Sequence, residues 1–318
     1  MINVPAPALN AADLADADDQ GTKVTFWTRL RRHRLAIVSI FVLGFIILAA
    51  ILAPVLTHFI THWDPNAIDD VAWKGDPVPP CFVNALTCGG HILGTDEVGR
   101  DLLSRLLYGA QVSLQVGIFA VIMELIIGTV IGAVAGYYGG WVDYVLMRVT
   151  DVFLSIPLLP LLLVLTSIVA TSSSKASLSF GVIVLIIGAL TWPSVARLVR
   201  ASFLSLRERE FTEAARAVGN NDARIIFRHL LPNAVAPIVV QATLDVAGVI
   251  ITESAISFLG YGIQPPTASW GNMLASAEAT LQTGWWVAVF PGLCIFFTVL
   301  AINYLGDGLR DALDPNTR

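Results

Sequence analysis

Four carboxylates lie within or beside long apolar stretches of the sequence: Glu124, Asp151, Asp245 and Glu253. A charge in the hydrocarbon of a bilayer is costly, so such residues usually face a protein interior or a water path. Glu124 and Asp245 fall near the middle of their stretches and could line a path that receives a cationic group. The alternative is a hydrogen bond to a neighbouring helix or to a partner subunit. Asp151 follows Arg148 by three residues, which predicts a structural ion pair on one helix face.

The cysteines suggest one covalent link. Cys81 and Cys88 lie in a Pro-rich stretch that the charge pattern places outside the membrane, where disulfides persist. We expect them to be bonded to each other. A metal site that uses His91 is the alternative, but it has too few evident ligands, and we expect no metal. Cys294 lies within an apolar stretch and is expected to pack there.

Enzyme chemistry is not predicted. The sequence has no G-x-x-x-x-G-K-[ST] phosphate loop, and its five histidines are scattered without a nucleophile beside them. We therefore expect no catalytic residue, no cofactor and no nucleic-acid partner.

The elements that carry these residues are membrane spans. The 318 residues are 55% hydrophobic and 14% charged, whereas soluble domains are about one quarter charged. A spanning helix needs about 20 mainly apolar residues. Six stretches qualify: 35–60, 108–136, 143–170, 176–203, 233–258 and 285–307. Glycines recur in the second, at Gly117, Gly128, Gly132 and Gly136, where small residues permit close helix packing.

The placement of basic residues predicts the orientation. Lys74, Arg100, Arg105 and Lys175 fall on one side, and the rest of the 19 Lys and Arg residues fall on the other. Basic loops stay in the cytoplasm, so both termini are predicted to be cytoplasmic. The predicted order is given by residue ranges: a cytoplasmic tail 1–34, a first span 35–60, an extracytoplasmic insert 61–104, a membrane core 105–310 and a cytoplasmic tail 311–318.

The most basic cytoplasmic loop is the segment 205–232, which is longer than a simple connection needs. Phe211, Ala214, Ala215 and Val218 recur at helical spacing and predict one apolar face. Gly219 is expected to end this helix. Asn221 or Asp222 could cap a second short helix, after which Pro232 begins the fifth span.

Several motifs in this order resemble a known family. The letters "EAA" at 213–215, Gly219 and "LP" at 231–232 match the EAA signature of ABC importer permeases, although His229 stands where that pattern often has an aliphatic residue. The stretches "HILGTDEVGRDLLSRLLYGAQVSL" (91–114) and "ESAISFLGYGIQPPTASWGNML" (253–274) resemble the C-type permease subunit of dipeptide and oligopeptide ABC importers. The resemblance covers about residues 25–315.

The resemblance implies an all-α integral membrane protein with six transmembrane helices and the type I importer permease fold. Implied partners are a second permease, two ATPase subunits that hold ATP and Mg, and an extracytoplasmic binding protein, in a bacterial or archaeal cell membrane. ATPase contact is implied for Glu213, Ala214, Ala215, Arg216, Gly219, Leu231 and Pro232. A role in the outer gate is implied for Glu253, Pro265, Pro266, Trp270 and Gly271.

The outer loop 259–284 is expected to re-enter the membrane with non-helical backbone at 269–271, which survives there only beside protein or water. Within the family, importers of nickel, glutathione or oligosaccharides share these motifs, so the cargo stays open. A secondary transporter would tend to show internal repeats, and none is evident between the two halves.

Overall fold

The computed structural model describes residues 30, 33–70, 73–86, 88–172 and 180–313. Most of the predicted N-terminal tail, most of the connection between the predicted spans 143–170 and 176–203, and the end of the C-terminal tail lie outside these residues. The described chain is helical apart from loops and two isolated β-bridges. In chain order the elements are α3 (Arg34–Ile51), α4 (Ala53–Leu56), η1 (Thr57–Thr61), α5 (Leu102–Tyr138), α6 (Gly140–Ser155), α7 (Leu158–Ser172), α8 (Phe180–Arg207), α9 (Glu210–Ala217), α10 (Asp222–Ile225), η2 (Ile226–Leu230), α11 (Leu231–Phe258), α12 (Trp270–Ala277), η3 (Glu278–Thr280) and α13 (Trp285–Leu313).

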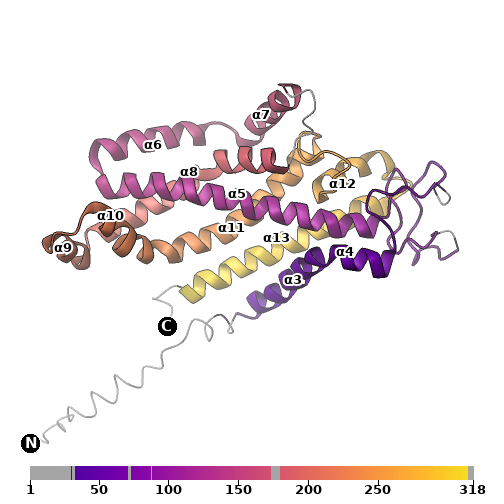
Figure 1. Ribbon diagram of the computed structural model, residues 1–318, viewed down its shortest axis with the longest axis horizontal. Coiled ribbons are helices and arrows are strands. Elements are labelled where there is room, and N and C mark those ends of the chain that lie inside the picture. The colour runs from indigo at the N-terminus through magenta and orange to yellow at the C-terminus, as the bar shows by residue number, and fades with distance from the viewer. Residues whose placement is uncertain (1–29, 31–32, 71–72, 87, 173–179, 314–318) are drawn as a thin grey trace, which may run out of the picture.

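Long apolar helices form the body of the molecule. Among the described residues, five helices are long and apolar enough to cross a membrane, and the bent pair α6–α7 can make a sixth. Figure 1 shows α3, α5, α8, α11 and α13 running along the long axis, with α9 and α10 at one end and α12 near the other. We call these two ends the α9 end and the insert end. The protein is therefore a multi-pass, all-α membrane protein.

Close packing of α5 against α8 rests on the predicted glycines. A Cβ on Gly128 would lie 2.7 Å from the Cβ of Val195, and one on Gly136 would lie 2.6 Å from the Cβ of Phe203. A Cβ on Gly132, between them, would overlap the carbonyl oxygen of Ala196. Glycine every fourth residue thus lets the two backbones approach, as predicted for small residues in lipid.

The third predicted span, 143–170, corresponds to the bent pair α6 and α7, which together can make one span but are not one straight helix. α6 and α7 meet at an angle of 84°. Pro157 explains the break: the residue before a proline is driven out of the helical region, and Ile156 is extended with φ −88° and ψ 127°. Pro160 follows inside the first turn of α7, where a missing N–H costs little.

A buried histidine organises the insert between η1 and α5. His91 Nδ1 lies 2.9 Å from Asp101 Oδ1, and Nε2 lies 3.3 Å from Asp69 Oδ2. The ring stacks on Trp63 with centroids 4.6 Å apart. Cys81 and Cys88 are joined in a disulfide in the same region. The insert is therefore held by polar and covalent links rather than by regular structure.

The two ends of the described chain meet. His33 Nε2 lies 2.6 Å from Asp311 Oδ2, and Leu30 and Ala36 form a small buried cluster with Ala312. Figure 1 shows the start of α3 and the end of α13 pointing toward the α9 end. An even number of crossings, with α6–α7 counted as one, fits this arrangement.

Candidate functional site

The EAA letters lie on α9, a short helix with a well-defined end. Gly219 has φ +83°, a left-handed conformation that favours glycine. The N–H of Gly219 donates to the carbonyl of Arg216, and the N–H of Asn220 donates to that of Ala215. This pair of bonds is the Schellman motif, so Gly219 ends the helix as predicted. Asn221 then caps α10 by accepting from the N–H of Arg224.

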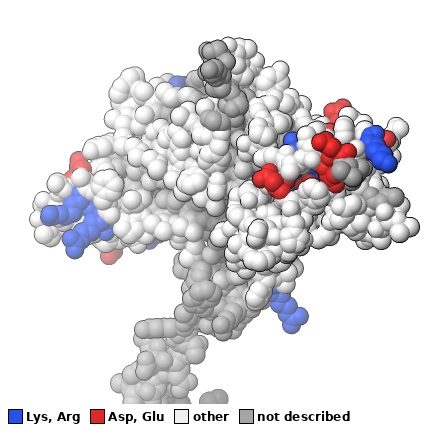
Figure 2. All heavy atoms as spheres, turned by 45° about the vertical axis from the view of Figure 1, so that its right-hand side comes forward, with Lys and Arg blue, Asp and Glu red and all other residues white. Residues whose placement is uncertain are grey.

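The predicted apolar face of α9 is exposed rather than packed. Ala215 is buried, together with Thr212, but Phe211, Ala214 and Val218 are exposed, Val218 at 84%. Glu213, Arg216 and Gly219 are exposed as well. Figure 2 shows Lys and Arg gathered at this end of the molecule. An exposed apolar strip within a basic surface is typical of a site that another protein covers.

The segment is braced against the long helices. Tyr137 Oη, at the end of α5, donates to Asp222 Oδ1 over 2.6 Å, and the Arg216 guanidinium lies 5.6 Å from the Tyr137 ring centroid. Arg207 Nη1 donates to the carbonyl of Tyr137 over 3.3 Å. Displacement of α9 and α10 would therefore act directly on α5 and α8.

The second short helix is not a separate element, contrary to the sequence prediction. α10, η2 and α11 run on without a break, and the candidate span extends over Asp222–Phe258. Pro232 directly follows the π-helical turn η2 at the start of α11, and such a turn is a usual feature where the regular hydrogen-bond ladder of a helix is interrupted. Leu231 is half-buried at this junction and Pro232 is exposed.

Glu253 lies in α11 and is fully buried. Its carboxylate accepts from Ser257 Oγ over 2.7 Å and from Ser113 Oγ, on α5, over 3.4 Å. Ser113 Oγ in turn accepts from the N–H of Trp270 over 3.2 Å. Glu253 thus links α5 and α11 to the start of α12.

Trp270 and Gly271 open helix α12, so the expectation of non-helical backbone at 269–271 was wrong for these two residues. Ser269 is the extended N-cap, and Ser269 and Asn272 form a capping box that starts the helix. Trp270 is buried and its Nε1 donates to the carbonyl of Leu106. A Cβ on Gly271 would lie 2.6 Å from the Cα of Ser254, so glycine permits α12 to lie against α11.

The proline pair of the same loop is also anchored. Pro265 and Pro266 are joined by a cis peptide bond, and Arg105 Nη1 donates to the carbonyl of Pro266 over 3.4 Å. The five residues assigned to the outer gate therefore occupy one hydrogen-bonded region at the insert end.

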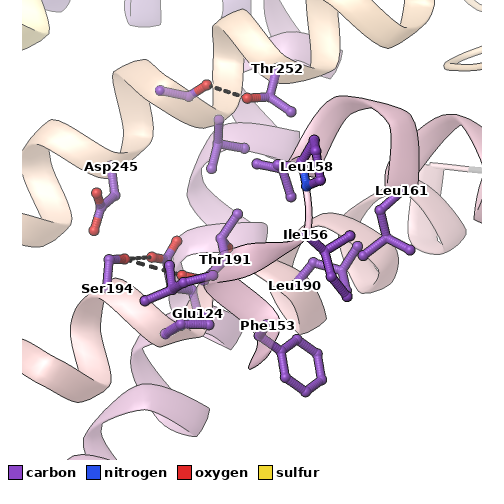
Figure 3. A pocket seen from close by; sticks show the side chains of 15 residues that line it. Glu124, Phe153, Ile156, Leu158, Leu161, Leu190, Thr191, Ser194, Asp245 and Thr252 are labelled. Atoms are coloured by element: carbon purple, nitrogen blue, oxygen red, sulfur yellow. Dashed lines mark hydrogen bonds between the residues drawn. The ribbon is translucent and has the colours of Figure 1, made fainter. Parts of the chain in front are cut away.

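Glu124 and Asp245 line one cavity of about 460 Å³ between α5, the α6–α7 break, α8 and α11. Glu124 is 1% exposed; its Oε1 accepts from Ser194 Oγ over 3.2 Å. Asp245 Oδ1 accepts from Gln241 Nε2 over 2.8 Å. Figure 3 shows the Asp245 carboxylate pointing toward Ser194 and Glu124. The two carboxylates that the sequence singled out from separate spans are thus brought together.

Asp151 has two basic partners. The predicted ion pair with Arg148 is present, with Nη1 4.0 Å from Oδ2, and Arg197 on α8 lies closer, with Nη2 2.5 Å from Oδ1. One turn along α8, Arg200 pairs with Asp143 of α6. Two ion pairs therefore clamp α6 onto α8, because these side chains face each other across the helices.

Several residues at these sites were not expected from the sequence. Ser113 and Ser194 carry hydrogen bonds to buried carboxylates, and Tyr137 holds the α9 segment. Serine and tyrosine inside a span have no distinctive spacing. The α6–α7 break did leave a signal, since Pro157 interrupts an apolar run. Among the described residues, no group of three His, Cys, Asp or Glu could hold a metal ion.

Sequence comparison identifies relatives along nearly the whole chain. Residues 128–318 match the family model "Binding-protein-dependent transport system inner membrane component", and residues 24–77 match the "N-terminal TM domain of oligopeptide transport permease C". A dipeptide transport system permease protein DppC of Alkalihalophilus pseudofirmus is 39% identical, over 95% of this chain and 93% of that protein. A glutathione transport system permease protein GsiD of Escherichia coli O6:K15:H31 is 40% identical, over 98% and 96%.

The fold has a solved counterpart. The MetNI methionine ABC transporter in an inward-facing conformation matches with a TM-score of 0.53 and 21% identity, over 66% of this chain and 96% of the matched chain. At this identity the likeness concerns the fold alone, which is that of a type I importer permease. The chain belongs to the binding-protein-dependent transport family of inner-membrane components and is a C-type permease subunit of an ABC importer.

Proposed function

We propose that the chain forms half of the translocation path of an ATP-driven importer of dipeptides or short oligopeptides. The observation that carries this is α9: an exposed apolar strip on a basic end, fixed to α5 through Tyr137 and Asp222. A docked ATPase subunit would cover the strip and push on the membrane helices. The contact residues are Glu213, Ala214 and Arg216 with the surrounding Ala215, Gly219, Leu231 and Pro232.

The proposed assembly places the α9 end in the cytoplasm. Basic residues gather at this end and acidic ones at the insert end (Figure 2), as the positive-inside rule requires. Both termini would then be cytoplasmic, and the insert would face the binding protein. Two ATPase subunits supply ATP and Mg, and a second, different permease completes the path, because six spans alone form a ring too small to enclose a path for a peptide.

Peptides are the proposed cargo because a named dipeptide permease and a named glutathione permease are both similar over nearly the whole chain. Glutathione, itself a short peptide, is the second candidate on the same observation. Glu124 and Asp245 are proposed to line the path, since both border the cavity inside the membrane body.

The proposed cycle is a rocking of packed helices. ATP binding draws the two ATPase subunits together and moves α9. Because α10 is continuous with α11 and α9 follows α8, both helices turn with it. The turn acts at the far end on Glu253 and Trp270, whose hydrogen bonds to Ser113 hold α12 against α5. Opening of this outer gate admits the cargo, in the manner of rigid-body transitions.

Two substitutions in α9 test the proposal in the complete complex. Glu213→Arg reverses a charge on the exposed surface of α9, and Gly219→Pro places a proline at a positive φ that its ring cannot adopt. We expect both to lower transport-linked ATP hydrolysis while the protein still inserts. Glu278→Arg, the same reversal on an exposed residue of η3, should leave transport-linked ATP hydrolysis unchanged. Normal transport in the two α9 variants would refute the coupling role.

A further inference from the structure

The cavity beside the α6–α7 break contains acceptor atoms without donors. Among the residues that the structure describes, none places an N–H or O–H donor within hydrogen-bond geometry of the buried atoms Glu124 Oε2 and Asp245 Oδ2. Buried polar atoms are normally satisfied, because each orphan costs about 1–3 kcal/mol. Two orphan carboxylate oxygens on one cavity indicate a ligand that brings donors.

The rest of the lining shows what kind of ligand fits. Thr191 and Thr252 add hydroxyl oxygens with free lone pairs, since each donates its own proton to a backbone carbonyl one turn earlier. Most of the remaining wall is apolar, with Phe153, Ile156 and Leu158 contributed by the two sides of the break (Figure 3). A ligand for this cavity therefore has one cationic donor group on an apolar body.

We propose that this cavity is a transient binding site for the primary ammonium group of the cargo, held by Glu124 Oε2 and Asp245 Oδ2. The proposal rests on the proposed peptide function, because a peptide with a free amino terminus brings such a group. An ammonium has three donors and no acceptor, which matches a wall of acceptors. A metal ion fits less well, because the described residues offer no third His, Cys, Asp or Glu beside the two carboxylates.

The position of the cavity fits an intermediate binding site along the proposed translocation path. Ser194 borders it, and Arg197 and Arg200 follow at intervals of three residues along α8 toward the α9 end. Asp143, Asp151 and Arg200 border a second hollow of about 430 Å³ on that side. The Arg197–Asp151 ion pair borders this second hollow, because Asp151 is part of its lining. An ammonium leaving the two carboxylates would next meet Asp151 and Asp143, which are already paired with Arg197 and Arg200 and therefore hold it less strongly than the cavity does.

Photolabelling of the complete membrane complex without its binding protein tests the site. The probe is alanyl-photoleucine, a dipeptide with a diazirine side chain, used with a free or an acetylated amino terminus. We expect the free form to label peptides that contain the cavity wall. Labelling by the acetylated form should be weaker by a factor of about ten or more, because the charge-assisted hydrogen bond of the ammonium group is lost.

Substitution of the carboxylates completes the test. Glu124→Gln with Asp245→Asn should reduce labelling by the free dipeptide to the level of the acetylated one. Asp307→Asn, on an exposed acid of α13 outside the cavity, should label like the wild type. If the double variant does not assemble with its partners, either single variant should still lower labelling several-fold.

Equal labelling by the two dipeptides, wild-type labelling in the carboxamide variants, or no labelling of the cavity wall would overturn the proposal. Import by the wild-type complex with its binding protein is measured separately. Failure to import either dipeptide would overturn the peptide function, and the contrast between free and acetylated probes would still decide whether the cavity binds ammonium.

Discussion

At the scale of residues, His91 makes the insert depend on pH. Burial lowers the pKa of His91, but hydrogen bonds and charge from Asp101 and Asp69 outweigh burial and raise it above 6.5. The folded insert then binds the proton more tightly than the unfolded chain does. This contribution to stability is complete below pH 6.5 and is lost as the pH rises through the higher folded pKa.

We therefore expect the insert to become less protected as the pH is raised above 6.5. Amide hydrogen exchange of insert peptides, corrected for intrinsic rates, measures this. His91→Gln, which cannot take up the proton, should give lower protection with a flatter pH profile. Protection that increases with pH in the wild type would contradict the assignment.

The three cysteines give a second test at this scale. Cys81 and Cys88 are paired, and Cys294 is free. Thiol labelling of the denatured, non-reduced protein should modify one cysteine, and reduction should expose two more. Closing so short a loop is worth on the order of 2–3 kcal/mol in the chain-entropy model, so Cys81→Ser should loosen the insert rather than unfold the membrane body. Labelling of all three without reductant would refute the bond.

At the scale of elements, the contact between α5 and α8 depends on Gly132. A Cβ there would overlap the carbonyl oxygen of Ala196, so Gly132→Ala must separate the helices. We expect a loss of about 1–3 kcal/mol, the usual cost of overpacking. Gly44→Ala in α3 is the matched control, because nothing lies within 4 Å of its added Cβ. In thermal unfolding in detergent, Gly132→Ala should have a lower unfolding midpoint than Gly44→Ala. Equal midpoints for the two variants would contradict the packing argument.

The hydrogen bond between Tyr137 of α5 and Asp222 next to α9 can be removed by deleting a single oxygen atom. Tyr137→Phe removes the hydroxyl that donates to Asp222 and keeps the ring beneath Arg216. We expect ATPase subunits to co-purify normally, while fewer peptides are imported per ATP hydrolysed. The matched control is Tyr304→Phe, which removes a hydroxyl from α13. An unchanged import-to-hydrolysis ratio in Tyr137→Phe would show that force reaches the spans by another route.

At the scale of the whole molecule, the orientation can be tested at its two most exposed tips. Val218 in the α9 segment is 84% exposed and Leu86 in the insert is 97% exposed. In a Cys294→Ser chain expressed without its ATPase partners, we expect a membrane-impermeant maleimide to label Leu86→Cys on intact cells and Val218→Cys only in inverted vesicles. If Val218→Cys is labelled on intact cells and Leu86→Cys only in inverted vesicles, the topology is the reverse of the proposed one and the proposed mechanism is refuted.

The sequence alone determined the membrane class and the number of apolar stretches, because burial in lipid demands long runs without charge. It also determined the end of α9, since Gly219 and Asn221 act on their immediate neighbours through local backbone bonds. The family followed from motifs whose order and spacing are properties of the chain itself.

Only the tertiary structure decided which distant residues meet. Glu124 and Asp245 come from different spans, and their common cavity depends on the 84° break that makes room for it. Asp151 gains Arg197 as a second and closer partner beside Arg148 because α8 packs against α6, which no local spacing encodes. Trp270 is helical because Ser269 and Asn272 form a capping box that starts α12, and because α12 packs closely against α11. Local signals fix where helices begin and end, whereas pairing between helices depends on packing of the whole bundle, and the candidate sites lie at those pairings.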